Sequence, residues 1–385
     1  MRKAFKKIAV IGSTGSIGVQ SLEVAAHNGF EITALAAKSN IELLEKQIRQ
    51  FKPKLVAVYD TDKASELKLR VADTSTKVVS GMDGVIAAAQ ERSADLVITS
   101  LVGMIGILPT IAAIEAGKDI GLANKETLVC AGEIIMPLAK KKGVKIIPVD
   151  SEHSAIFQSL MGAGENKIKK IILTASGGPF FGKTREELKG ITPEKALKHP
   201  NWDMGAKITI DSSTLINKGL EFIEAYWLFG VSPSQIEIVI HRESILHSAV
   251  EFEDGSVIGQ MGVPDMRVPI QLAVTYPMRC PSPAKSLSLT DCGKLTFYKP
   301  DYKTFTGLEA FMNAIEVGGT MPTALNAANE EAVSLFLNRK IGYNDISDIV
   351  CDTLVSHRAE KITSAEQILA VEKQVKSDVF CKYCK

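Results

Sequence analysis

The chain has 385 residues, and its 45 Lys and Arg against 44 Asp and Glu leave a formal net charge of +1. At roughly 150 residues per domain, this length predicts two or three domains. A hydrophobic content of 45% with 23% charged residues is typical of a folded protein rather than a disordered one. The balanced charge excludes a general nucleic-acid binder, which carries a basic excess, although one small phosphate needs only a local pocket.

Targeting and crosslinking signals are weak. Six cysteines are too few for a disulfide scaffold. Cys381 and Cys384 form a Cys-x-x-Cys pair without a second ligand pair nearby, so we expect an inert tail. The basic start runs directly into a strand, which predicts a cytoplasmic protein without a signal peptide. Leu96–Ile114 lacks charges, but its glycines and Pro109 favour a buried strand, a turn and a helix over a membrane span.

The first 149 residues alternate short apolar runs with helical patterns. Ile41, Leu44 and Ile48 recur at helical spacing, for example, within a predicted helix at 40–51. This alternation predicts βαβ units and a parallel sheet, the Rossmann-like arrangement of a dinucleotide-binding domain. The predicted strands are Lys7–Ile11, Glu31–Ala36, Leu55–Tyr59, Leu96–Thr99, Asp119–Ala123 and Val144–Val149.

The pattern changes at residue 150 to an α+β arrangement. A helix is expected near Leu215–Phe229, and a Pro-rich stretch from Tyr276 leads into a mostly helical remainder with its clearest helix at Thr323–Asn338. The predicted strands are Lys169–Thr174, Lys207–Ile210, Glu237–Ile240 and Val257–Met261. We therefore expect an α/β fold with three domains, at 1–149, 150–280 and 298–385, with a linker at 281–297.

A glycine-rich loop follows the first strand. Gly12, Gly15 and Gly18 allow a tight turn, and the helix that opens there offers free N–H groups to a pyrophosphate. The spacing is G-x-x-G-x-x-G, and a purely structural turn is the alternative. The second predicted strand ends without the acid that binds an NAD ribose. Lys38, Ser39 and Asn40 follow it instead, which favours NADP unless Lys38 is simply a solvated residue at a helix start.

Two acids follow the last strand of the first domain. Asp150 and Glu152 point the same way if the chain stays extended, and two close carboxylates favour a hard divalent ion between them. Two solvated acids at a helix start are the alternative. Lys125 also follows a strand, where it would reach the same edge to act on an oxyanion or a cofactor, or would lie on the surface.

Two further loops have anion-binding character. Ser176 with Gly177 and Gly178 resembles a backbone nest with a hydroxyl at its mouth. Ser212 or Ser213 is expected to open the next helix, either as a plain cap or as a ligand to an anion. On that helix Asn217 and Glu221 share a face beside Lys218.

The segment 180–205 is long and loop-rich. It contains His199, Trp202 and Met204, and the alternatives are a lid that closes over a ligand or an ordinary hydrophobic plug. His241 and His247 lack metal-like spacing, so we expect both to be structural.

Taken together, the motifs resemble those of the 1-deoxy-D-xylulose 5-phosphate reductoisomerase family from about Lys7 to about Ala370, and no position that carries the family's chemistry is substituted. The motifs that carry this resemblance are Gly12–Gly18, Ala123–Glu126, Pro148–His153, Ser176–Pro179, His199–Gly205, Asn217–Glu221 and Ala324–Glu330.

The resemblance implies an NADP-dependent oxidoreductase that is a homodimer and uses Mg²⁺, Mn²⁺ or Co²⁺. It rearranges 1-deoxy-D-xylulose 5-phosphate and reduces the product to 2-C-methyl-D-erythritol 4-phosphate, an isoprenoid precursor. Its implied metal ligands are Asp150, Glu152 and Glu221, which are also catalytic together with Lys125. The implied substrate contacts are Ser151, Glu152, Ser176, His199, Trp202, Ser212, Asn217, Lys218 and Glu221. The implied NADPH contacts are Thr14, Gly15, Ser16, Ile17, Lys38, Ser39, Asn40, Asn124, Lys125, Glu126 and Gly205.

Two other classes compete with this interpretation. A non-catalytic nucleotide-sensing regulator would need neither three carboxylates nor a lid. A semialdehyde dehydrogenase needs a nucleophilic cysteine at a helix start, and Cys130 is expected in the middle of a helix.

Overall fold

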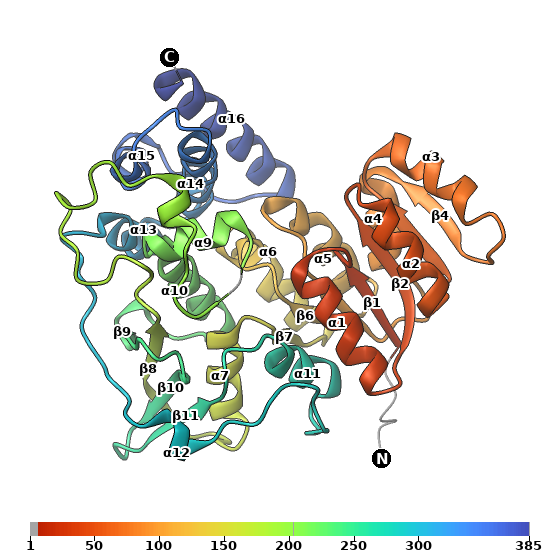
Figure 1. The fold of residues 1–385 in the computed structure, drawn as a ribbon, viewed down its shortest axis with the longest axis horizontal. Coiled ribbons are helices and arrows are strands. Elements are labelled where there is room, and N and C mark those ends of the chain that lie inside the picture. Colours follow the sequence, from red (N-terminus) through yellow and green to blue (C-terminus); the bar gives the residue numbers. More distant parts are fainter. Residues whose placement is uncertain (1–6, 203, 385) are drawn as a thin grey trace. The chain divides into compact units, whose positions relative to one another are not determined.

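The computed structural model describes residues 7–202 and 204–384, and its contacts divide the chain into two compact units. Unit 1 contains the described residues up to Thr127 together with Ile135–Ser154 and Asp265–Lys285. Unit 2 contains Leu128–Ile134, Ala155–Pro264 and the described residues from Ser286 onward. Figure 1 labels most of the elements of both units. The expected three-domain division stays a prediction.

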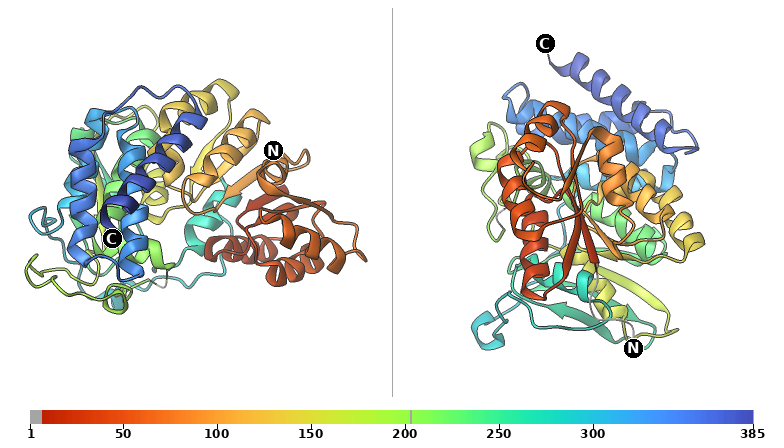
Figure 2. Two further views of the ribbon diagram at one scale, coloured as in Figure 1. Left: turned by 90° about the horizontal axis from the view of Figure 1, so that it is seen from above. Right: turned by 90° about the vertical axis from the view of Figure 1, so that its right-hand side faces the viewer.

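Unit 1 is built on a parallel sheet of seven strands in the order β4-β3-β2-β1-β5-β6-β7. The predicted Rossmann-like fold is confirmed, and helices cover both faces of the sheet (Figure 2). The strands are β1 (Lys7–Ile11), β2 (Glu31–Ala37), β3 (Leu55–Val58), β4 (Lys77–Ser80), β5 (Leu96–Thr99), β6 (Asp119–Leu122) and β7 (Ile146–Pro148). The helices are α1 (Ser16–His27), α2 (Ile41–Phe51), α3 (Thr61–Arg70), α4 (Gly81–Ala89), η1 (Met104–Gly106), α5 (Ile107–Glu115) and α11 (Arg267–Thr275).

The order of the strands fixes where a ligand can bind. Strand β1 lies between β2 and β5, and the connections from it run in opposite directions on its two sides. Ligands of open α/β sheets bind at this switch point, beyond the carboxyl ends of the strands. The loop that follows Ile11 is therefore the expected dinucleotide site.

Two helices contain residues of both units. Helix α6 (Glu126–Lys142) departs from helical backbone angles at Ala131, and its residues Leu128–Ile134 belong to unit 2. Helix α7 (Ser151–Leu160) changes unit after Ser154. Cys130 lies inside α6, as expected, and its side chain is buried.

Unit 2 combines a mixed sheet with a cluster of helices. The sheet order is β11-β10-β8-β9, in which β8 and β9 are parallel and the other pairs are antiparallel. The strands are β8 (Ile168–Ala175), β9 (Ile236–Ile240), β10 (Leu246–Phe252) and β11 (Val257–Met261). The helices are α8 (Pro193–Ala196), α9 (Ala206–Ser213), α10 (Ile216–Phe229), η2 (Pro233–Gln235), α12 (Leu289–Cys292), α13 (Thr306–Val317), α14 (Met321–Leu337), α15 (Tyr343–Ser356) and α16 (Ala365–Tyr383).

One prediction for unit 2 is wrong, and one strand of its sheet was not predicted. Lys207–Ile210 is not a strand but part of helix α9, where Lys207 pairs with Asp211 one turn later at 2.8 Å. Strand β10 was missed. The end of the chain is helical, because α16 continues through Cys381 to Tyr383, and Asp352 of α15 accepts the Tyr383 hydroxyl at 2.7 Å. That this tail is inert stays a prediction.

The uncharged stretch 96–114 forms β5, η1 and α5, as predicted. Among the described residues, no helix combines the length and the apolar character needed to cross a bilayer.

Candidate active site

The loop after β1 places a helix start at the switch point of the sheet. Gly12 and Ser13 donate their N–H groups to the Ala36 carbonyl at 2.8 and 2.9 Å, which turns the chain toward α1. Gly15 is the N-cap of α1 and supplies no side-chain cap. Thr14–Ile17 are half-buried or exposed, so this helix start is accessible to an anion.

Two of the glycines are required by space. A Cβ atom on Gly18 would lie 2.2 Å from the Gly12 carbonyl oxygen. Gly12 has φ of 99°, and a Cβ atom there would lie 2.6 Å from the Ser100 carbonyl oxygen. Gln47 of α2 fixes the loop further, because its amide exchanges two 2.8 Å hydrogen bonds with Ser13. Contacts within unit 1 thus set the conformation of the loop.

The residues predicted to select NADP lie at the end of the second strand. Lys38, Ser39 and Asn40 are all exposed, directly after β2. The Asn40 side chain caps α2 by accepting the Leu43 N–H at 3.1 Å. The side chains of Lys38 and Ser39 are exposed and could bind a ribose phosphate, whereas the Asn40 side chain caps α2.

Asn124 is also structural in this unit. It is 2% exposed, and its amide donates to the Gly103 carbonyl at 2.8 Å while its oxygen accepts the Thr127 N–H at 2.8 Å. It ties the loop after β5 to the start of α6, where Lys125 and Glu126 follow.

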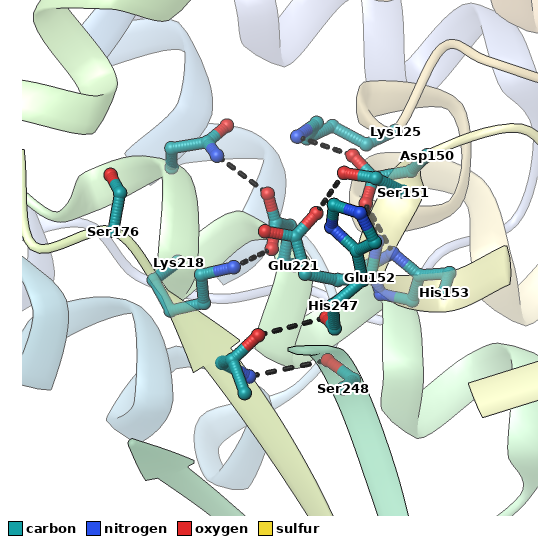
Figure 3. Close-up of polar contacts among 12 residues, drawn as sticks. Lys125, Asp150, Ser151, Glu152, His153, Ser176, Lys218, Glu221, His247 and Ser248 are labelled. Atoms are coloured by element: carbon teal, nitrogen blue, oxygen red, sulfur yellow. Dashed lines mark hydrogen bonds and ion pairs between the residues drawn. The ribbon is translucent and has the colours of Figure 1, made fainter. Parts of the chain in front are cut away.

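Unit 1 also brings together Lys125 and the acids that follow β7 (Figure 3). Lys125 is not a surface residue: it is 6% exposed, and its ammonium contacts the Asp150 carboxylate at 2.9 Å. The other oxygen of Asp150 accepts from the Glu152 N–H at 3.2 Å and contacts His153 Nδ1 at 3.1 Å. The Ser151 hydroxyl donates to Glu152.

The geometric argument for Asp150 and Glu152 was wrong in one respect. The chain does not remain extended, because α7 begins at Ser151 and Glu152 lies in its first turn. The two carboxylates are instead placed by a turn that Asp150 itself stabilises.

In unit 2, the first turns of α10 carry the predicted polar face. Asn217 donates to one oxygen of Glu221 at 2.5 Å. The Lys218 ammonium contacts the other oxygen of Glu221 (Figure 3). Lys218 is 3% exposed and Glu221 1%. A fully buried ion pair of this kind is costly to form, which argues for a functional reason to keep it.

Ser212 is not at the start of a helix, contrary to the prediction. Ser212 and Ser213 form the last turn of α9, and Leu215, with φ of 59°, precedes α10 without a side-chain cap. The Tyr343 hydroxyl fixes this corner by donating to the Ser213 carbonyl at 2.6 Å. Ser212 is half-buried beside the Ser176 loop, since a Cβ atom on Gly178 would lie 2.7 Å from its carbonyl oxygen.

The Ser176 loop has the properties of an anion site. Gly177 and Gly178 have φ of 76° and 64°, which requires glycine. His199 Nδ1 accepts the N–H groups of Asn201 and Trp202 at 3.1 and 2.9 Å, so the ring proton resides on Nε2 and is donated to the Ser176 oxygen at 3.0 Å. That oxygen also accepts the Gly178 N–H, which leaves the Ser176 hydroxyl hydrogen available to a ligand.

The segment 180–205 has little regular structure beyond the four residues of α8. Phe180 is buried against Tyr343, with ring centroids 5.1 Å apart, while Trp202 is half-buried at 6.1 Å from the His247 ring. Position 203 of the predicted lid lies outside the described residues. Gly205 is exposed at the N-cap of α9.

Of the two histidines expected to be structural, His241 is confirmed. Its Nε2 accepts the N–H groups of Ile245 and Leu246 at 3.2 Å, and Nδ1 donates to the Thr296 carbonyl at 2.9 Å. Sequence reasoning missed their neighbour Arg242, whose guanidinium contacts the Ser176 loop. No local signal marks it, because its partners lie more than sixty residues away in sequence.

Comparison with known proteins identifies the family. Three family profiles cover most of the chain: 1-deoxy-D-xylulose 5-phosphate reductoisomerase at residues 8–132, the C-terminal domain of that enzyme at 146–229, and the DXP reductoisomerase C-terminal domain at 261–378. The reductoisomerase of Agathobacter rectalis is 56% identical over 95% of this chain and 97% of its own length. The chain belongs to the 1-deoxy-D-xylulose 5-phosphate reductoisomerase family.

Further relatives agree in sequence and in fold. The reductoisomerase of Lachnoclostridium phytofermentans is 55% identical over 96% of both chains. The Zymomonas mobilis enzyme, solved in complex with NADPH, matches with a TM-score of 0.93 and 38% identity over 98% of this chain and 99% of its own. Another reductoisomerase, solved with NADPH, fosmidomycin and magnesium, matches with a TM-score of 0.92 and 38% identity over 98% of both chains.

The family assignment makes this chain an NADPH-dependent oxidoreductase that converts 1-deoxy-D-xylulose 5-phosphate to 2-C-methyl-D-erythritol 4-phosphate. The predicted activity is therefore confirmed, and the regulator and the semialdehyde dehydrogenase are excluded as alternatives.

Proposed function

We propose that this chain catalyses the family reaction with Asp150, Glu152 and Glu221 as ligands of one divalent cation and with NADPH at the Gly12–Gly18 loop. The observation that carries the proposal is that each unit holds an acid against a buried lysine. Buried Glu221 and nearly buried Asp150 each contact a lysine ammonium, so both carboxylates are placed away from water where they already meet positive charge.

The chemistry of these donors fits a hard ion. Each residue supplies a carboxylate oxygen, and an all-oxygen set suits Mg²⁺ or Mn²⁺ and admits Co²⁺. When bound, such an ion supplies Lewis-acid polarisation of a carbonyl oxygen. Relatives solved with magnesium support the assignment.

The side chains of this protein then bind and orient the substrate. Lys218, Asn217, Ser176 and Ser212 would hold the phosphate and neighbouring hydroxyls, and Ser151 and Lys125 would contact the reacting end. Phosphate contacts remote from the reacting carbons supply binding energy that can be used to orient the substrate. Lys125 is buried with its ammonium against Asp150, from which it would donate hydrogen bonds to a developing oxyanion.

NADPH would bind in unit 1. The free N–H groups of α1, with Thr14, Gly15, Ser16 and Ile17, suit the pyrophosphate, and Lys38 and Ser39 with Asn40 suit the 2′-phosphate. Asn124 would act by fixing its loop, and Lys125 and Glu126 complete the proposed set in unit 1. Gly205, which belongs to unit 2, is a further proposed contact. His199 and Trp202 would cover the substrate as part of a lid at 180–205, which excludes water from the reaction.

The proposal includes a homodimer in the cytoplasm. Strand β11 is the edge of its sheet and exposes Val257 and Ile258 by 55% and 49%. An apolar edge strand is a pairing surface that isolated proteins avoid, so we place the second copy there. The cytoplasmic location stays a prediction from sequence.

NADPH oxidation with 1-deoxy-D-xylulose 5-phosphate tests the proposal, with and without Mn²⁺ after chelation of the purified protein. We expect turnover only with the metal, and a kcat/KM for NADPH well above that for NADH. Metal-independent turnover would contradict the ligand assignment, and equal values for the two cofactors would remove the role given to Lys38, Ser39 and Asn40.

A further inference from the structure

Arg242 holds two segments of the candidate phosphate site together. It lies in the turn between β9 and β10, and its Nη1 donates to the carbonyl oxygens of Ser176 and Gly178 at 2.5 and 2.6 Å. The guanidinium also lies over the Phe181 ring, 5.1 Å from its centroid. The carbonyl groups of Ser176 and Gly178 are therefore both turned toward one cation.

This orientation decides where the loop's N–H groups point. The carbonyl of Ser176 and the N–H of Gly177 belong to one trans peptide, in which they point in opposite directions. With the carbonyl held by Arg242, the Gly177 N–H faces away from Arg242, and no acceptor contacts it among the described residues. Gly178 is followed by Pro179, which has no N–H group. Turning the Gly178 carbonyl toward Arg242 therefore reorients no backbone donor.

The same arginine is linked to the lid. Asn201 donates its amide to the Arg242 carbonyl at 2.8 Å and to the Ser244 hydroxyl at 2.9 Å. The Asn201 N–H contacts His199 Nδ1, and His199 Nε2 contacts Ser176, which Arg242 also binds. Ser176, His199, Asn201 and Arg242 thus form a closed ring of hydrogen bonds, the Arg242 ring.

The charge of Arg242 is not cancelled by an acid. Across residues 7–202 and 204–384, no carboxylate lies within ion-pair distance of its guanidinium, and burial lowers the pKa of Arg242 while the nearby Glu243 raises it. An arginine stays protonated under these conditions. A half-buried positive charge therefore lies directly behind the loop that offers a hydroxyl and an N–H to an anion.

We propose that Arg242 is the positioning residue of the phosphate site, which turns the Ser176–Gly178 loop into an anion-binding conformation and anchors the lid segment His199–Trp202 to it. This inference rests on the proposed function, in which Ser176 holds the substrate phosphate. Arg242 acts through the loop and does not touch the reacting atoms.

The test compares Arg242→Met, Arg242→Lys and the control Arg358→Met, which removes an exposed arginine of the same unit. Arg242→Met removes hydrogen bonds from a charged donor, so we expect the substrate KM to rise by roughly 10-fold or more, with the NADPH KM unchanged. Arg242→Lys keeps the charge and should recover part of the loss. The control should match the wild type.

Calorimetric titration of the substrate without NADPH separates this inference from the proposed function. If the wild type binds without any turnover while Arg242→Met binds roughly 10-fold more weakly, the proposed function fails and the role of Arg242 stands. A substrate Kd and KM of Arg242→Met within twofold of the wild type would overturn the inference. The inference would also be overturned if Arg242→Met and Arg242→Lys lost NADPH binding and substrate binding equally and had a lower Tm.

Discussion

Single side chains fix the charge of the candidate site before any ligand arrives. Lys125 and Lys218 are buried with their carboxylate partners, while His199 is held neutral between backbone donors and Ser176. Substitution of any of these residues would disturb the contacts that hold its partner.

Glu221→Gln should abolish turnover while leaving NADPH binding intact. The amide cannot replace an anionic ligand and leaves the buried Lys218 without its charged partner, whereas the dinucleotide loop belongs to unit 1. NADPH fluorescence titration and initial rates measure the two effects. Glu253→Gln, at an exposed acid, is the matched control. Unchanged metal-dependent turnover in Glu221→Gln would reject its role as a ligand.

Lys218→Ala should raise the substrate KM by roughly 10-fold or more, because a charged hydrogen bond to the phosphate is lost. Steady-state kinetics against substrate at saturating NADPH provide the measurement. Lys167→Ala, at an exposed lysine of unit 2 outside the proposed lid, controls for charge. An unchanged KM would mean that the phosphate binds elsewhere.

His199 should remain neutral throughout the physiological range. Burial, and then the charge of Arg242, lower its pKa from 6.5 to about 4. Because the unfolded state binds a proton near 6.5, the contribution of His199 to stability is complete above that pH and is lost as the pH falls toward 4. Histidine-resolved NMR titration of the wild type and Arg242→Met tests this, since removal of the arginine should raise the pKa. A wild-type value near 6.5 would contradict the expectation.

At the scale of elements, the site depends on how strands and helices end. The β1–α1 turn is closed by Gly12 and Gly18, and the α9–α10 corner by Tyr343 from α15. Whether an element could be predicted depends on whether its pattern is local or relies on contacts distant in sequence. Lys7–Ile11 and the glycine loop carry their own local pattern, whereas Lys207–Ile210 is a short apolar run that suits either a strand or a helix. Helix α9, which forms at these residues, also makes contacts that are distant in sequence: Asn329 donates to Asp211 at 2.8 Å.

Gly18→Ala should impair NADPH binding much more than it affects substrate contacts in unit 2. The added methyl group would lie 2.2 Å from the Gly12 carbonyl, so the loop must move. Gly162→Ala, where no atom lies within 4 Å, is the control. Fluorescence titration measures the NADPH Kd of both variants. A wild-type Kd for Gly18→Ala would mean that the loop can shift to accept the methyl group.

At the scale of the whole molecule, sequence reasoning reached the family, whereas its list of site residues stays a prediction and it did not foresee how those residues are placed. Lys125 was not recognised as buried, and Arg242 was not recognised at all. Both depend on segments brought together only by the folded chain, such as Asp150 for Lys125 and Ser176 for Arg242. Spacing along the sequence contains no information about such pairs.

Ile258→Lys should convert the proposed homodimer to a monomer, because a charge on the β11 edge opposes pairing with a second copy. Analytical ultracentrifugation measures the mass. Val355→Lys changes an 87% exposed valine on α15 and should leave the mass unchanged. A wild-type monomer, or a dimer that survives Ile258→Lys, would place the interface elsewhere or remove it.

Neither unit is one continuous stretch of chain. The polypeptide changes unit after Thr127, Ile134, Ser154, Pro264 and Lys285, and Asp265–Lys285 returns to unit 1 to pack α11 against α1. A single genetic crossover at any of these points would leave at least one unit incomplete. We therefore expect that this family cannot exchange its cofactor half for that of another dehydrogenase by simple gene fusion. Inheritance of the chain as a whole agrees with relatives that match it over nearly their full length.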